Sequence, residues 1–216
     1  MMVSAEARWF WRGTPPADLE RWFVLRPIAA GGGTLRLDEY LLDARQQELG
    51  IKRRGAIGAP PDADAIEVKG LVETRPPLPH PFPARVQIWT KWKSPALRID
   101  GLPCIRVWKT RRLRKFDTAG STALELALDA NEKMLDRAAP LPALGCHIEL
   151  VALEVGEARA RWWTLAFEAF GPLDTVEESL VRTMADVHPI KPAALLGGLE
   201  LSYPAWLATE IARQFP

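Results

Sequence analysis

Polar and apolar residues alternate along much of this chain. A period of two residues is typical of a β-strand whose two faces meet different surroundings. The clearest hairpin lies near the C-terminal third, with a turn at Gly156-Glu157. The alternation predicts eight strands in all, over Ser4–Arg12, Thr34–Leu42, Leu49–Arg54, Ala65–Glu73, Arg85–Ser94, Cys104–Phe116, Cys146–Val155 and Ala158–Phe170.

Four other segments have the composition of helices. Ser121–Arg137 is rich in Ala, Leu and Glu and begins with a good N-cap, so a helix is predicted there, with a strand over its first half as the alternative. Shorter helices are predicted over Ala17–Val24, Asp174–Val187 and Pro204–Gln214. Loops are predicted at Gly31-Gly32-Gly33, Gly58–Asp64 and the proline-rich Arg75–Pro83.

The charged residues of the strands gather on one face. Lys and Arg dominate that face in four strands, whereas Asp and Glu occur on it singly. Either this face meets water on an open sheet, or it lines the inside of a closed barrel and concentrates anions. The residues concerned are Lys52 and Arg54, Glu67 and Lys69, Lys91 and Lys93, and Lys109 and Arg111.

Composition limits the classes of function. The 216 residues fit one domain, 1–216, and a formal net charge of +1 gives no overall attraction to nucleic acid or membrane. No apolar run reaches the ~18–20 residues of a membrane helix, and Met1–Arg12 lacks a signal-peptide core. Cys104 and Cys146 have no metal-site spacing. A cytoplasmic protein with reduced thiols is therefore expected, with no membrane partner.

The histidines and tryptophans are given mainly structural roles. His147 is expected to face a helix or solvent, and His80 and His188 are expected to take no part in a site. Most of the nine tryptophans are expected to pack in the core. Trp89 is the candidate to stack on a ring of a ligand.

Several segments also carry the motifs of one family. Ser4-Ala5-Glu6-Ala7-Arg8 has the spacing of a Glu-x-Glu-x-Lys strand, with Ser4 at the first Glu and Arg8 at the Lys. Further motif-like segments are Tyr40-Leu41-Leu42-Asp43, Leu49–Arg54, Ile66–Lys69, Lys109-Thr110-Arg111, Leu144–Glu149 and Ser202–Leu207. In this order they resemble the CYTH superfamily, the triphosphate tunnel metalloenzymes. The last segment is similar to the tail of the class IV adenylate cyclase and thiamine-triphosphatase members.

The resemblance implies an α+β protein built on an eight-stranded antiparallel β-barrel, a tunnel flanked by helices. It implies a triphosphate or other phosphate-rich anion as ligand, with Mg²⁺ or Mn²⁺ as cofactor. Glu6 and Glu149 would hold the metal, and Glu67 and Glu168 would be additional acidic residues. No catalytic residue is assigned. The expected substrate-binding residues are Arg8, Lys52, Arg54, Lys69, Lys91, Lys93, Lys109 and Arg111.

Four functions stay open at this point. The first is a metal-dependent triphosphatase or phosphohydrolase, and the second is a binding module of the same fold without the chemistry. Ser4 and Val151 stand where the family has carboxylates, which favours the second, because a hard cation needs oxygen ligands. The third, a module that binds the end of a nucleic acid, is not favoured by the near-neutral charge. The fourth is a structural protein with a charged outer sheet.

Overall fold

A computed structural model describes residues 2–24, 33–55, 65–78, 84–136, 138, 140–187, 195 and 197–212. The predicted turn at Gly31-Gly32, the predicted loop Gly58–Asp64, His80 and His188 lie outside this part of the chain. Within it, no helix is both long and apolar enough to cross a membrane. Cys104 and Cys146 are free thiols.

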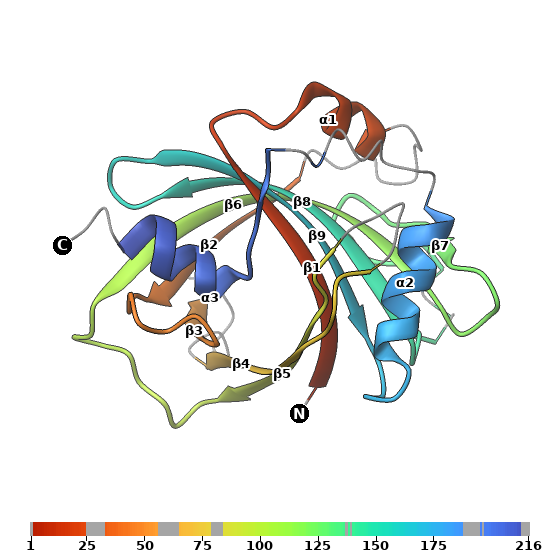
Figure 1. Ribbon diagram of the computed structural model, residues 1–216, viewed down its shortest axis with the longest axis horizontal. Helices are drawn as coiled ribbons and strands as arrows, with labels where there is room; N and C mark the ends of the chain where they lie inside the picture. Colours follow the sequence, from red (N-terminus) through yellow and green to blue (C-terminus); the bar gives the residue numbers. More distant parts are fainter. Residues whose placement is uncertain are drawn as a thin grey trace.

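Eight antiparallel strands close into a barrel (Figure 1), which confirms the predicted fold class. Neighbours follow the order β1-β5-β4-β3-β2-β6-β8-β9, and β9 pairs with β1 from Ser4↔Phe170 to Trp9↔Leu165 and on to Arg12↔Trp162. Because β9 pairs with β1, each of the eight strands has a partner on both sides along part of its length. The strands are β1 (Met2–Arg12), β2 (Thr34–Leu41), β3 (Leu49–Arg54), β4 (Ile66–Thr74), β5 (Gln87–Ser94), β6 (Cys104–Asp117), β8 (Gly145–Val155) and β9 (Ala160–Phe170).

Two helices cover part of the outside of the barrel. The outward residues of β1, among them Ala5, Ala7 and Trp9, belong to a buried apolar cluster. The helices α1 (Ala17–Val24) and α2 (Val176–Asp186) add residues such as Leu19 and Leu180 to that cluster. In Figure 1 both helices lie outside the ring of strands. Because side chains alternate along β1, the residues between these apolar ones point into the barrel.

A C-terminal helix closes one end of the barrel. The short α3 (Tyr203–Trp206) begins after the N-cap Ser202, whose Oγ accepts a hydrogen bond from the Ala205 amide at 3.2 Å, and continues into the π-helical turn η3 (Leu207–Ile211). The indole of Trp206 stacks on the Phe10 ring at 4.7 Å between centroids, inside the barrel. The helix predicted over Pro204–Gln214 is thus present, and it acts as the floor of the barrel.

Of the two alternatives for Ser121–Arg137, the helix is wrong, and the strand over the first half is confirmed. The segment instead forms β7 (Leu124–Leu126), paired with β6, followed by a turn closed by a bridge between Leu128 and Met134. The pairing of β2 with β6 ends at Arg111, so the last residues of the long β6 keep an unpaired edge. Pairing with that edge outweighs the helical propensity of a solvent-exposed segment.

A second small strand, β10 (Leu199–Glu200), pairs with β1 beside the incoming α3. Through this pairing the C-terminal segment is fixed to the strand that carries Glu6 and Arg8. The barrel and its floor therefore form one continuous structure around a central cavity.

Candidate anion-binding cavity

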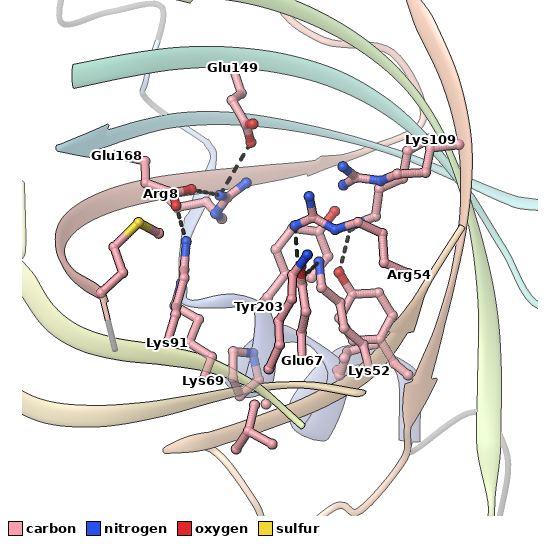
Figure 2. Close-up of a pocket in the computed structure, with 18 of the residues that line it drawn as sticks. Arg8, Lys52, Arg54, Glu67, Lys69, Lys91, Lys109, Glu149, Glu168 and Tyr203 are labelled. Atoms are coloured by element: carbon pink, nitrogen blue, oxygen red, sulfur yellow. Dashed lines mark hydrogen bonds and ion pairs between the residues drawn. The ribbon is translucent and has the colours of Figure 1, made fainter. Parts of the chain in front are cut away.

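The interior of the barrel above α3 contains a cavity of about 480 Å³. Its floor includes Tyr203, Pro204 and Leu207 of the C-terminal helix. Three acidic residues line the wall: Glu67, Glu149 and Glu168. Nine basic residues line it: Arg8, Arg36, Lys52, Arg54, Lys69, Lys91, Lys93, Lys109 and Arg111. Figure 2 shows many of these side chains converging on one space.

Strand register explains why these residues meet. Lys69 of β4 is the cross-strand partner of Lys91 of β5, and Arg36 of β2 is the partner of Lys109 of β6. Directly opposed residues of antiparallel strands point to the same face, and two-residue spacing keeps the next pair on that face as well. The local period of each strand and the closure of the ring together turn separate cations into one basic lining.

The deepest ion cluster surrounds Asp38. Its carboxylate lies 2.9 Å from Arg36, 3.0 Å from Lys109 and 3.3 Å from Lys52. The Lys109 ammonium also donates to the Tyr40 hydroxyl at 2.5 Å. Burial alone would raise the pKa of Asp38, but the three cations, Lys109 first, hold it far below its usual range. Burial lowers the pKa of Lys109 well below its usual value, against the pull of Asp38.

A second cluster surrounds Glu6 in the middle of β1. The Ser4 hydroxyl donates to its carboxylate at 2.8 Å, Lys91 lies 3.4 Å away, and Lys69 donates to the other oxygen. Burial opposes ionisation of Glu6, yet Lys69 and Lys91 outweigh it, and its pKa is strongly lowered. Burial, offset in part by Glu6, lowers the pKa of Lys91 to about 8.

Arg8 connects this cluster to the carboxylates of the neighbouring strands β9 and β8. Its guanidinium lies 3.7 Å from Glu149 and 3.8 Å from Glu168. Figure 2 marks both contacts. Glu149 also accepts a hydrogen bond from Arg111 at 2.9 Å. Despite burial, which would raise the pKa of Glu149, Arg111 and Arg8 lower it strongly. Glu6 and Glu149 are therefore ionised, and each is shared between cations.

His147 was expected to face a helix or solvent, and that prediction is wrong. It lines the cavity beside Glu149, two residues along β8 and on the same face. Burial lowers its pKa to about 4, so it is neutral at pH 7. The prediction that Trp89 stacks on a ring of a ligand is wrong as well. Trp89 is fully buried, and the Lys69 ammonium lies 4.7 Å from its ring centroid. Its indole therefore offers no face to a ligand.

The cavity opens at the end opposite α3. The side chain of Lys93 is 64% exposed and that of Arg54 is 45% exposed, against 4% for Lys109 near the floor. At this mouth Glu67 contacts Arg54 at 2.9 Å and Lys52 at 3.2 Å, and these cations lower its pKa to about 2 in spite of burial. A ligand therefore meets the arginine and lysine of the mouth before the deeper lysines.

The geometry places all eight predicted substrate-binding residues in the cavity wall, together with Glu67, Glu149 and Glu168; Glu6 lies buried behind the lining. Their roles remain predictions. Sequence reasoning missed Arg36, Asp38, Tyr40 and Tyr203. The alternation Arg36-Asp38-Tyr40 within one strand was a usable signal for three of them. Tyr203 lies on a helix, and only the position of that helix brings it to the cavity.

The carboxylates expected to hold a metal do not fit one as they are arranged. Both oxygens of Glu6 face hydrogen-bond donors from Ser4, Lys69 and Lys91, and Glu149 is held by two arginines. In the part of the chain that the structure describes, no three His, Cys, Asp or Glu side chains gather to hold an ion. A divalent cation there would meet ammonium and guanidinium groups at hydrogen-bonding distance. Binding of Mg²⁺ or Mn²⁺ stays a prediction that requires these ion pairs to exchange.

Comparison of the chain with protein-family models gave no match, and comparison with curated proteins gave none either. The similarity to the CYTH superfamily therefore stays a prediction based on the motifs. The class of site rests on the geometry alone: a closed-floor β-barrel cavity with a strongly basic wall.

Proposed function

We propose that this barrel binds a phosphate-rich small anion in its basic cavity. The observation that carries the proposal is the imbalance of charge in the wall, nine cations against three carboxylates. The motif resemblance to the CYTH superfamily points to the same kind of ligand.

The internal carboxylates support the proposal because they are too few to neutralise the cations. Asp38 is shared by three cations, and Glu67 is also shared by three. Each cluster therefore keeps a net positive charge next to the cavity. Charges that are partly buried are screened much less than charges on the surface. A cavity of one sign with low-dielectric walls raises the local concentration of an oppositely charged ligand.

Several features favour phosphate groups over a single carboxylate. The cations are spread from the floor, at Lys109, to the mouth, at Arg54 and Lys93, so full engagement requires several negative charges along one ligand. Arginine binds phosphate oxygens in a bidentate manner, and lysine supplies a mobile point charge. Because α3 closes the floor, a linear ligand enters phosphate first and keeps any organic part at the mouth.

Binding without hydrolysis is the form of the proposal that the site favours. Glu6 and Glu149, the expected metal ligands, neutralise lysine and arginine side chains here. Hydrolysis would require a divalent cation to replace these partners, with the substrate phosphates completing its coordination. Turnover is therefore the second outcome to be tested.

The test is isothermal titration calorimetry with inorganic phosphate, pyrophosphate and tripolyphosphate, each with Mg²⁺ and with EDTA, alongside phosphate release from tripolyphosphate. We expect affinity to rise with the number of phosphates and to fall steeply with salt, since each neutralised phosphate releases counterions. Arg54→Gln should weaken binding of tripolyphosphate.

The control is Arg161→Gln, which removes the same charge from an exposed residue at the far end of β9 and should leave the affinity unchanged. Absence of binding by the wild-type protein, or equal weakening by both variants, would overturn the proposal. Phosphate release that requires Mg²⁺ or Mn²⁺ and disappears in Glu6→Gln would establish the hydrolase instead.

A further inference from the structure

The loop between β7 and β8 places one carboxylate against a cation of the cavity wall. Glu132 is paired through its side chain with Arg111, a residue of the cavity wall. Its backbone carbonyl accepts a hydrogen bond from the Lys115 ammonium at 2.7 Å. The side chain is 14% exposed, and within the described residues its Oε1 is buried with no hydrogen-bond partner. Glu132 thus contacts two basic side chains of β6, one through its carboxylate and one through its backbone carbonyl.

The turn that presents Glu132 is tightly built. The Asp129 carboxylate accepts from the amides of Asn131, at 2.8 Å, and Lys133, at 3.0 Å, and the Asp129 amide donates to the Lys133 carbonyl at 2.7 Å. Glu132 itself has φ +61°. A non-glycine residue in this region is strained, and such strain is frequent where a side chain must be held in a functional place.

We propose that Glu132 covers an anion subsite formed by Arg111 and Lys115, and that a ligand reaching Arg111 must displace it. This inference rests on the proposed function, because it takes the ligand of the cavity to be phosphate-rich. Glu132 is then an internal competitor that weakens binding of anions long enough to extend from the floor to Arg111.

The contacts of Arg111 support this exchange. On one side Arg111 is held by Glu149, a residue of the barrel wall that accepts at 2.9 Å. On the other side it is held by Glu132, which belongs to the loop between β7 and β8 and not to a strand of the barrel. A phosphate group would supply more negative charge and more acceptor oxygens than the single carboxylate it replaces. The unpaired Oε1 of Glu132 would return to water.

Chain length of the ligand provides a specific readout. A short anion can bind the deeper lysines and leave Glu132 in place, whereas a longer one competes with it for Arg111. Removing the carboxylate should therefore improve binding of tripolyphosphate more than binding of inorganic phosphate. If removal of the carboxylate acted only by making the cavity more positive, binding of tripolyphosphate and of inorganic phosphate would improve equally.

The experiment measures dissociation constants of tripolyphosphate and inorganic phosphate for the wild-type protein, Glu132→Gln and Glu132→Asn. Asparagine tolerates the left-handed backbone and so preserves the turn without the charge. We expect roughly 10- to 150-fold tighter binding of tripolyphosphate in both variants, from the usual strength of a hydrogen bond to a charged group. Glu157→Gln, which removes a carboxylate from the exposed β8–β9 turn at the opposite end of the barrel, should change nothing.

A double-mutant cycle separates this role from a purely structural one. In an Arg111→Gln background, Glu132→Gln should no longer improve the affinity, because the contested cation is absent. Binding by the wild-type protein with no improvement in either Glu132 variant would overturn the inference and leave the proposed function standing. Absence of binding in the wild type together with binding in Glu132→Gln would support it in its strongest form. Absence of binding in every protein would overturn both proposals.

Discussion

The Lys109 ammonium lies 3.0 Å from the Asp38 carboxylate on the closed floor of the barrel, and the two side chains are 4% and 0% exposed. The pair joins the neighbouring strands β6 and β2, on which Val107 and Asp38 are opposed. Because Arg36 and Lys52 also contact Asp38, a single carboxylate holds three cations together at the bottom of the cavity.

Loss of the Asp38 charge should therefore destabilise the fold. In Asp38→Asn, three neighbouring cations would remain buried without their shared anion, and breaking a buried ion pair in this way costs about 3–5 kcal/mol. Urea denaturation measures the change. Asp43→Asn is the control, since Asp43 pairs with the exposed Arg45 and should leave the free energy of unfolding almost unchanged. Equal unfolding midpoints for the two variants would contradict the role of Asp38.

The two stacked tyrosines of the floor should differ in their contribution to stability. The ring centroids of Tyr40 and Tyr203 lie 5.4 Å apart. Among the described residues, the Tyr40 hydroxyl contacts Lys109 and Asp38, whereas the Tyr203 hydroxyl has no hydrogen-bond partner. We expect Tyr40→Phe to cost about 1.5–3 kcal/mol, as for hydrogen bonds to charged groups, and Tyr203→Phe to cost almost nothing. Chemical denaturation of both proteins tests this, and equal losses would show that stacking, not hydrogen bonding, is what matters.

Acid should unfold the protein through its internal carboxylates. The cations of the cavity lower the pKa of Glu67 to about 2 and those of Glu6 and Glu149 further, all below the ordinary 4.5. A pKa that is lower in the folded state gives stability that is complete above pH 4.5 and is lost as the pH falls toward 2. Urea midpoints between pH 7 and pH 3 should therefore decrease, and a constant midpoint would contradict these ion pairs.

Glu67→Gln provides the matched variant for the acid series. It should be less stable than the wild type at pH 7, because Arg54 and Lys52 lose their partner. The difference between the two proteins should become small near pH 2, where Glu67 of the wild type is itself becoming protonated. A difference that stays the same at all pH values would mean that packing, and not charge, explains the loss.

Binding of an anion should weaken in mild alkali through Lys91. Burial lowers its pKa to about 8, so above that pH the unliganded cavity loses one positive charge. Calorimetry with tripolyphosphate from pH 7 to pH 9.5 should show a steeper loss of affinity for the wild type than for Lys91→Arg, since arginine stays protonated. Comparing the two proteins at each pH cancels the titration of the ligand itself. Identical pH profiles would exclude Lys91 as the titrating group.

Part of this architecture follows from the sequence because a strand has a local period. Two-residue spacing alone places Lys91 beside Lys93 and Lys109 beside Arg111 on one face, whatever the strands pair with. The same reasoning located every strand of the barrel within a few residues. It failed at Ser121–Arg137, where composition favours a helix but the open edge of β6 provides a better partner.

Only the tertiary structure decided which charges meet and which end of the barrel is closed. Glu6 and Lys69 are distant along the chain, and their ion pair depends on the closure of the ring around β1, β5 and β4. The position of Tyr203 on the floor and the pairing of Glu132 with Arg111 depend on how a helix and a loop pack against the barrel. The face of the sheet to which a side chain points is set by its position in its own strand. The partner of that side chain is set by contacts between segments far apart in the sequence, and a local pattern does not encode those contacts.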